Sequence, residues 1–353
     1  MFGMSLRKVI KFAALAGAFV LVFSRASPAA ACSWVFWSNN PQAKVVARSM
    51  DLYIPDQPKI YVFPKGISRD GKAGENSAKW TSKFGSVIIT ALDLAVSEGL
   101  NEKGLGVHLL YLSGTEYEPL DQLPRVANVL WPQYILDNFQ TVEEAVAHLK
   151  DFQVVSITAL ERQWPLHLAI QDASGDSAII EFLKGKMVVH HGLENRVLTN
   201  EPPYEEQIVN LKRYKLFGGS LAMPGDIHPK DRFVRASSYL KTLPEPKTVA
   251  EAVFYVLGVI RNVSSPFGAL ETGDEPTEDI WPTRWVTVMD LTHRVYYFNA
   301  TTSPNLFRIE LDRLKFAKGA PVLALDPQDP TLAGEISMKL RKAKAPFYTQ
   351  RLK

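Results

Sequence analysis

The residue with the clearest chemical potential in this chain is its single cysteine, Cys32. It directly follows a stretch that has the features of a secretory leader and that ends in three alanines. Cleavage before Cys32 would give one residue both a thiol nucleophile and a free α-amine. Such an amine has an ordinary pKa of about 7.7–8.0, so it can accept the thiol proton near neutral pH. This is the chemistry of an N-terminal-nucleophile amidase.

Residues 1–31 have the three parts of a signal peptide: a positively charged start, an apolar stretch from Phe12 to Phe23, and small residues before the cysteine. The apolar stretch is too short to span a bilayer comfortably, and no second one of about 20 residues follows it. We therefore expect a periplasmic or secreted protein with no membrane contact after leader removal. The alternative is a lipoprotein or binding module with a lipidated Cys32, but that signal usually has Leu where Ala29 stands.

The composition excludes several classes of function. The chain of 353 residues has a formal net charge of +3, and removing the four basic residues of the leader leaves −1 for the mature chain. This gives no support for nucleic-acid binding. A secreted protein with one cysteine has no internal disulfide, which favours a catalytic use of the thiol. No dinucleotide fingerprint or phosphate-binding loop is present, and the pair His190-His191 lacks metal-ligand spacing, so we expect no cofactor and no metal.

Two charged residues inside an apolar strand are candidate partners of the thiol. Arg48 could stabilise the thiolate, and Asp51 could orient the α-ammonium. The alternative is an ordinary ion pair at a solvated strand end. Residues three apart on a regular strand face opposite sides, so both can reach Cys32 only if the strand ends or bulges near Ser49.

Amide hydrolysis also needs hydrogen-bond donors for the tetrahedral oxyanion. Asn101 lies in an expected turn that spans Glu98–Gly104, where its backbone N–H would be free, and Asn200 follows a short strand and precedes two prolines. Taken alone, each asparagine is better explained as an ordinary turn residue, because asparagine is a favoured residue in turns. Arg232 stands at a helix start, and its alternative interpretation is a charge on the helix surface.

The elements that must position these residues are short antiparallel strands with helices grouped between them. This arrangement predicts an α+β layered fold in one domain, residues 32–353, rather than a parallel doubly wound sheet. A segment rich in acids, proline and glycine, Leu270–Pro282, is expected to be a loop. The expected strands are 32–37, 44–51, 60–64, 86–93, 105–113, 166–172, 177–183, 186–191, 284–290, 295–299 and 306–311, and the expected helices are 126–139, 142–151, 204–214, 231–243 and 249–262.

These pieces together resemble the choloylglycine hydrolase and penicillin V acylase family. The motifs occur in one order along nearly the whole mature chain, which makes them far more specific together than singly. They are Cys32 before a strand, Ala47-Arg48-Ser49-Met50-Asp51, Asn101-Glu102-Lys103-Gly104-Leu105, Leu198-Thr199-Asn200 and Arg232-Phe233-Val234-Arg235, with similar segments at Thr283-Arg284-Trp285 and Ser303-Pro304-Asn305.

The resemblance implies a four-layer αββα N-terminal-nucleophile hydrolase fold, no cofactor, and a homo-oligomer, a tetramer in the family. It implies Cys32 as nucleophile and base, with Arg48 and Asp51 as its electrostatic partners. The oxyanion donors implied are the backbone N–H of Asn101 and the side chain of Asn200. Arg232 is implied as a further active-site residue.

Two departures from the bile-salt enzymes of the family bear on the substrate, a small acyl amide. Those enzymes have no leader, and their segment between Asn200 and Arg232 is longer and helps to assemble the tetramer. Both departures favour the penicillin V acylase-like branch of Gram-negative bacteria, whose members also act on N-acyl homoserine lactones. Aromatic residues near the nucleophile in the sequence suggest an apolar acyl pocket, with Tyr53 as the predicted substrate-binding residue.

Overall fold

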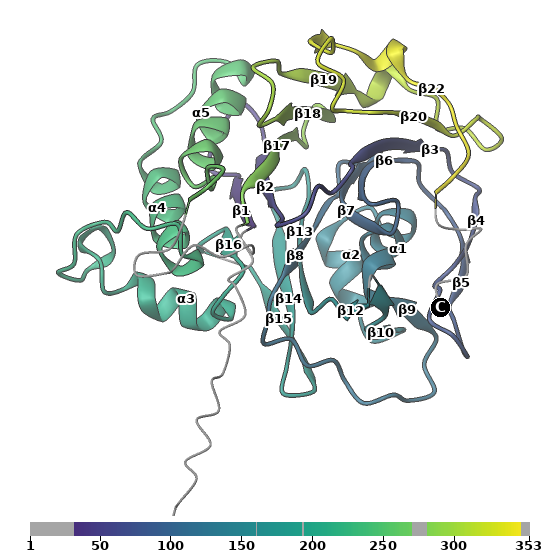
Figure 1. Ribbon diagram of the computed structural model, residues 1–353, viewed down its shortest axis with the longest axis horizontal. Coiled ribbons are helices and arrows are strands. Elements are labelled where there is room, and N and C mark those ends of the chain that lie inside the picture. The colour runs from purple at the N-terminus through teal and green to yellow at the C-terminus, as the bar shows by residue number, and fades with distance from the viewer. Residues whose placement is uncertain (1–31, 160, 193, 270–280, 347–353) are drawn as a thin grey trace, which may run out of the picture.

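Two large β-sheets stacked face to face form the centre of the computed structural model, which describes residues 32–159, 161–192, 194–269 and 281–346. Helices cover the outer face of each sheet, which gives four layers in the order αββα (Figure 1). The predicted α+β fold with antiparallel sheets is confirmed. None of the helices in these ranges has the length and apolar character to cross a membrane.

The first sheet has seven strands and contains the segment that follows the cysteine. All of its neighbours pair antiparallel except the last two. Every residue of its two strands closest to the N-terminus is buried, as expected for a sheet covered on both faces. In spatial order the strands are β16 (Val197–Thr199), β1 (Ser33–Trp37), β2 (Val45–Asp51), β17 (Thr283–Asp290), β18 (Val295–Ala300), β19 (Phe307–Glu310) and β21 (Gly334–Glu335).

The second sheet has nine strands, all paired antiparallel. One of them corrects the sequence analysis: the expected turn Glu98–Gly104 is a strand as far as Asn101. Glu98 and Gly99 at its centre have low strand propensity, which hid it. The strands are β15 (Lys186–His191), β14 (Ser177–Leu183), β13 (Leu166–Gln171), β8 (Gly106–Tyr111), β7 (Ala95–Asn101), β6 (Ser86–Ala91), β3 (Lys59–Phe63), β20 (Leu323–Leu325) and β22 (Arg341–Lys342).

The longest helices, α4 (Pro229–Thr242) and α5 (Val249–Asn262), pack on the seven-stranded sheet, and α3 (Tyr204–Leu211) packs on α4. On the other side, α1 (Trp131–Asn138) and α2 (Val142–Ala147) pack on the nine-stranded sheet (Figure 1). Gly99 allows α1 to approach, because a Cβ there would lie 2.7 Å from a methyl group of Leu136. The segment expected to begin this helix instead forms a short strand and a 3₁₀ turn.

The remaining elements are short. Six strands form two-stranded sheets: β4 (Ser68–Asp70), β5 (Lys79–Thr81), β9 (Arg125–Ala127), β10 (Gln153–Val155), β11 (Thr158–Ala159) and β12 (Arg162–Gln163). The 3₁₀ helices are η1 (Asn128–Leu130), η2 (Lys215–Phe217), η3 (Leu311–Arg313) and η4 (Ser337–Lys339). Most of the expected loop Leu270–Pro282 lies outside the described residues.

Candidate active site

The thiol lies between the two sheets. Cys32 directly precedes β1 and is 4% exposed. The antiparallel pairing of β1 with β2 sets Ser33 opposite Ser49 and Trp34 opposite Arg48. This register, fixed by the burial of both strands, brings Arg48 beside a cysteine that is 16 residues away in the sequence.

Arg48 is buried and points its guanidinium at the sulfur. Its Nη2 lies 3.6 Å from Sγ of Cys32 and donates to the carbonyl of Leu109 at 3.0 Å, while Nη1 donates to the carbonyl of Ser97 at 3.3 Å. Burial opposes its positive charge, but the neighbouring Cys32 and Glu98 hold the pKa of Arg48 above its ordinary value. A permanent positive charge therefore faces the thiol, as a thiolate requires.

Asp51 reaches the same site because its strand ends there. β2 ends at this residue, and the register of the neighbouring β17 shifts between Thr283 and Trp285, directly opposite. The condition that the sequence analysis set for Arg48 and Asp51 is thus met by a strand end and an irregularity in the adjacent strand. The backbone carbonyl of Asp51 lies 3.8 Å from Sγ of Cys32.

The carboxyl group of Asp51 is buried and accepts hydrogen bonds from two hydroxyls. Thr283 Oγ1 donates at 2.6 Å and Ser49 Oγ at 3.5 Å, and Nη1 of Arg232 lies 3.8 Å away. Burial raises the pKa of Asp51 to about 7, although Arg232 and Thr283 oppose this shift.

Asn200 binds the backbone nitrogen of Cys32. It follows β16, which pairs with β1, and its side chain is buried. Its Oδ1 accepts hydrogen bonds from the nitrogen of Cys32 and, at 3.2 Å, from Nη2 of Arg232. Its Nδ2 donates to the carbonyl of Tyr111 at 2.8 Å, which leaves the second hydrogen of this amide for another acceptor.

Arg232, in the first turn of α4, is fully buried. Its Nη1 donates to the carbonyl of Cys32 at 3.0 Å and to Oγ of Ser33 at 2.6 Å, and its Nε donates to the carbonyl of Ile227 at 2.7 Å. The alternative of a surface charge is therefore wrong. This side chain fixes the backbone of the cysteine from the helix layer.

The prediction for Asn101 is wrong. Its backbone N–H donates to the carbonyl of Leu105 at 3.0 Å, and its Oδ1 accepts from the nitrogens of Lys103 and Leu105. Its Nδ2 donates to the carbonyls of Leu136 and Phe139 at the end of α1. Asn101 closes the hairpin between β7 and β8 and binds a helix, so its hydrogen-bonding groups are used away from the thiol.

Tyr111, which the sequence analysis missed, lies where Asn101 was expected. The nitrogen of Leu112 donates to the carbonyl of Pro165 on the β13 side, so the N–H of Tyr111 faces the opposite side, toward β7. There, β7 pairs with β8 only over Glu98–Leu100, so the pairing ends before Tyr111. Its N–H is therefore not used in the pairing of these strands, and Tyr111 lines the cavity that contains the thiol, while its carbonyl accepts a hydrogen bond from Asn200. No local sequence signal marks such a position.

The thiol opens into a small cavity of about 90 Å³. Apart from the residues at the thiol and Ser97, its wall is apolar and partly aromatic, which suits an uncharged acyl group. The lining residues are Cys32, Arg48, Met50, Asp51, Leu52, Ala91, Leu92, Leu94, Ala95, Ser97, Leu109, Tyr111, Val129, Trp164, Leu166 and Trp281.

Tyr53, the predicted pocket residue, is not part of this wall. Its ring packs against Trp281 with a centroid distance of 5.2 Å, and its hydroxyl accepts a hydrogen bond from Arg162 at 2.7 Å. Tyr53 therefore supports a wall residue from behind, and Trp281, Trp164 and Tyr111 provide the aromatic surface instead.

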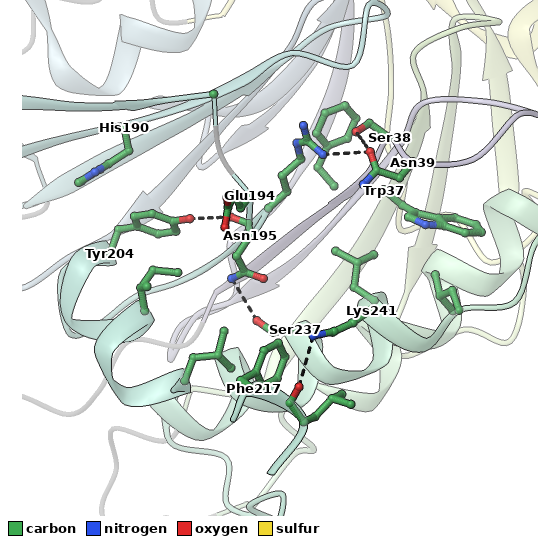
Figure 2. A pocket seen from close by; sticks show the side chains of 18 of the residues that line it. Trp37, Ser38, Asn39, His190, Glu194, Asn195, Tyr204, Phe217, Ser237 and Lys241 are labelled. Atoms are coloured by element: carbon green, nitrogen blue, oxygen red, sulfur yellow. Dashed lines mark hydrogen bonds between the residues drawn. The ribbon is translucent and has the colours of Figure 1, made fainter. Parts of the chain in front are cut away.

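A larger hollow of about 1200 Å³ lies between β15, the end of β1, α3 and α4 (Figure 2). Its wall mixes apolar and charged side chains, among them His190, Tyr204, Phe217 and Lys241. None of the predicted site residues is among the described residues that line it. This hollow is larger than the cavity at the thiol. The smaller cavity is nevertheless the candidate active site, because it contains the thiol with Arg48 and Asp51.

The side chains of His190 and His191, which the sequence analysis considered as metal ligands, each contact a carboxylate. Nε2 of His190 lies 3.2 Å from Glu181, and Nε2 of His191 lies 2.8 Å from Asp176. Within the described ranges, no group of three or more His, Cys, Asp or Glu side chains could hold a metal ion.

Known proteins are similar to this chain over most of its length. Residues 32–331 match a family model described as linear amide C–N hydrolases, choloylglycine hydrolase family. A penicillin V acylase from Pectobacterium atrosepticum is 37% identical over 337 residues, which cover 88% of this chain and 89% of the relative. A bile salt hydrolase/transferase from Clostridium perfringens is 26% identical over 301 residues, 75% of this chain and 88% of the relative.

Solved structures agree with this similarity. The structure of a penicillin V acylase from Agrobacterium tumefaciens superimposes with a TM-score of 0.79 at 39% identity and covers 89% of this chain and 98% of that one. A conjugated bile acid hydrolase from Clostridium perfringens superimposes with a TM-score of 0.70 at 20% identity, covering 86% and 98%, which demonstrates a shared fold.

Proposed function

Because this chain belongs to the choloylglycine hydrolase family and is an enzyme that hydrolyses linear amide C–N bonds, we propose that it uses Cys32 as an N-terminal nucleophile on a penicillin V-like acyl amide. The observation that carries the proposal is the arrangement around one residue. A guanidinium faces its sulfur at 3.6 Å, and the side chain of Asn200 binds its nitrogen. Thiol and amine thus have separate, dedicated partners.

The reaction begins when the α-amine of Cys32 takes the thiol proton, and the thiolate then attacks the amide carbonyl. The oxyanion of the tetrahedral intermediate accepts hydrogen bonds from Nδ2 of Asn200 and the N–H of Tyr111. The α-ammonium returns the proton to the leaving nitrogen as the C–N bond breaks and a thioester remains. Water, deprotonated by the amine, attacks the thioester, and the thiol leaves with its proton restored.

The charged neighbours divide the other tasks. Arg48 stabilises the thiolate, and Asp51 stabilises the α-ammonium whenever its own carboxyl is ionised. Arg232 holds the carbonyl of Cys32 and the Oδ1 of Asn200 in one orientation. It thereby fixes the position of the α-amine of Cys32 relative to Nδ2 of Asn200. The support for these roles is geometric: all four side chains are buried around one thiol.

Asn200→Ala is expected to lower kcat by ~10²–10³ with a smaller change in KM, since it removes one oxyanion donor. Steady-state kinetics on the processed enzyme measures this. Asn101→Ala is a matched control, because it removes another buried asparagine from a position outside the cavity. This control should lower the melting temperature and leave kcat within a few-fold. An unchanged kcat in Asn200→Ala would remove this residue from the mechanism.

The proposed substrate is penicillin V or a long-chain N-acyl homoserine lactone rather than a conjugated bile salt. The apolar cavity with Trp164, Trp281 and Tyr111 supports an aromatic or alkyl acyl group. The higher identity to penicillin V acylases, 37% against 26% for a bile salt hydrolase/transferase, supports the same choice.

We expect overlapping specificity among acyl chains, because each buried methylene contributes only ~0.8 kcal/mol to binding. The measurement is kcat/KM for penicillin V, an acyl homoserine lactone and a glycine-conjugated bile salt, side by side. If the bile salt is preferred by more than tenfold, the substrate assignment is wrong, while the amidase mechanism stands.

We also propose that the leader is cleaved before Cys32 and that the protein is periplasmic or secreted. We propose in addition that it forms a homo-oligomer, a tetramer as in the family. The composition of residues 1–31 and a family match that starts at residue 32 support the cleavage site. N-terminal sequencing of the mature protein tests it, and a lipidated or internal Cys32 would contradict it. Light scattering of the purified protein tests the oligomer, and a monomer would contradict it.

A further inference from the structure

Glu98, in the centre of β7, is a fully buried carboxylate that the mechanism above does not use. Its Oε1 accepts a hydrogen bond from the hydroxyl of Tyr296 at 2.5 Å. Its Oε2 lies 3.2 Å from Nδ1 of His108 and 3.5 Å from Nη1 of Arg48. Every neighbour directs a donor at it, which is the environment of an ionised carboxylate.

The next neighbours fix these donor directions. Nε1 of Trp34 donates to Oε1 of Gln171 at 3.0 Å, so Nε2 of Gln171 is left to donate to Nε2 of His108 at 3.1 Å. His108 must then carry its proton on Nδ1 and donate it to Glu98. Burial keeps the pKa of His108 below its ordinary value. Burial opposes the charge of Glu98, but the hydrogen bond from His108 and the positive charge of Arg48 lower its pKa.

The titratable groups around the thiol come from several elements. They are Arg48 and Asp51 on β2, Arg232 on α4, Glu98 on β7, His108 and Tyr111 on β8, and Tyr296 on β18. Two of them are permanent cations. Asp51 lies beside Arg232, at 3.8 Å, and burial lowers the pKa of His108. Glu98 is therefore the carboxylate beside Arg48, with Oε2 at 3.5 Å from Nη1.

Arg48 does not depend on Glu98 alone for its position. Backbone carbonyls accept its hydrogen bonds from three directions: Ser49 at 3.2 Å, Ser97 at 3.3 Å and Leu109 at 3.0 Å. Removing the charge of Glu98 while keeping its shape thus leaves the guanidinium facing Cys32, and changes the electric field at the sulfur.

We propose that Glu98 is a positioning residue of this active site: it binds the far side of the Arg48 guanidinium and sets the strength of the positive field that the Cys32 thiol experiences. A thiol beside an unbalanced arginine would ionise too easily, and a less basic thiolate is a weaker nucleophile. This inference rests on the proposed role of Cys32.

The test is the pH dependence of alkylation by iodoacetamide in the processed enzyme, which reports on Cys32 alone because the chain has one cysteine. In Glu98→Gln we expect the midpoint of the alkylation rate to move to lower pH by about one to two units, the size expected for one unit charge several Å away at an effective dielectric constant of ~20. The plateau rate and kcat should fall several-fold. An unmoved midpoint in folded Glu98→Gln overturns the proposal.

Tyr296→Phe is the matched control. It removes the hydrogen bond to Oε1 and keeps the charge, so it should lower the melting temperature and leave the midpoint unmoved; a shift equal to that of Glu98→Gln would overturn the proposal. If Glu98→Gln does not fold, Glu98→Asp carries the test, since a retracted carboxylate should cause a smaller shift in the same direction. No shift in folded Glu98→Asp would overturn the proposal.

The same assay separates this inference from the function it rests on. Complete alkylation of Cys32 in the wild-type enzyme should abolish hydrolysis. If activity survives alkylation, the nucleophile assignment fails. If activity is lost and the midpoints of wild type and Glu98→Gln coincide, the inference about Glu98 fails and the function stands.

Discussion

Cys32→Ala is expected to abolish amide hydrolysis and leave the fold intact. The methyl side chain fits the site of the buried thiol, and the backbone contacts of this residue remain, including the hydrogen bond from Arg232 to its carbonyl at 3.0 Å. Without sulfur no thioester can form, so the loss should reach the detection limit of a product-release assay. Circular dichroism and the melting temperature establish that the variant is folded.

Cys32→Ser refines this result. A hydroxyl keeps the size of the group, but the α-amine is too weak a base to activate it well, so we expect the loss of most activity. Hydrolytic activity should therefore fall in the order wild type, Cys32→Ser, Cys32→Ala. Substantial turnover by folded Cys32→Ala would show that another residue performs the attack.

An uncleavable Met-Ala extension before Cys32 is expected to abolish activity as completely as the loss of the sulfur. The added peptide bond turns the amine into an amide nitrogen, which cannot accept a proton near neutral pH. That nitrogen can still donate its hydrogen bond to Oδ1 of Asn200. The chain should therefore fold, keep its thiol and lack only the base.

Mass spectrometry confirms that the extension is intact before the rates are measured. The control is the same extension joined through a protease site whose cleavage exposes Cys32, and cleavage should restore full activity. Normal rates from the intact extended protein would identify a different base.

The motifs that lie next to Cys32 in the sheet could be predicted from the sequence. Arg48 stands on the strand that pairs with β1, and Asn200 follows the strand on the other side. Both therefore reach Cys32 through regular antiparallel pairing. Arg232 needed the resemblance to a family, because its contact depends on how α4 packs on the sheet.

The parts of the site that the sequence did not reveal depend on irregular geometry between layers. Asn101 has the residue type of an oxyanion donor, but its amide closes a hairpin and binds α1. Tyr111 has an ordinary strand sequence, and its N–H becomes available only because β7 and β8 separate there. Glu98 looked like a turn residue because a buried carboxylate in a strand is unusual without its partners, and those come from distant segments.

The four-layer arrangement places most of the proposed catalytic side chains and most of the acyl wall in different layers. The proposed nucleophile Cys32, with Arg48, Asp51 and Asn200, belongs to the seven-stranded sheet and its connections, whereas most of the wall of the small cavity belongs to the nine-stranded sheet and the segments around it. Acyl preference can therefore diverge through substitutions in one layer while the catalytic layer stays unchanged. For directed evolution, this favours libraries at Leu92, Leu94, Val129, Trp164 and Leu166, with Glu98 held fixed because its carboxylate reaches Arg48 from that layer.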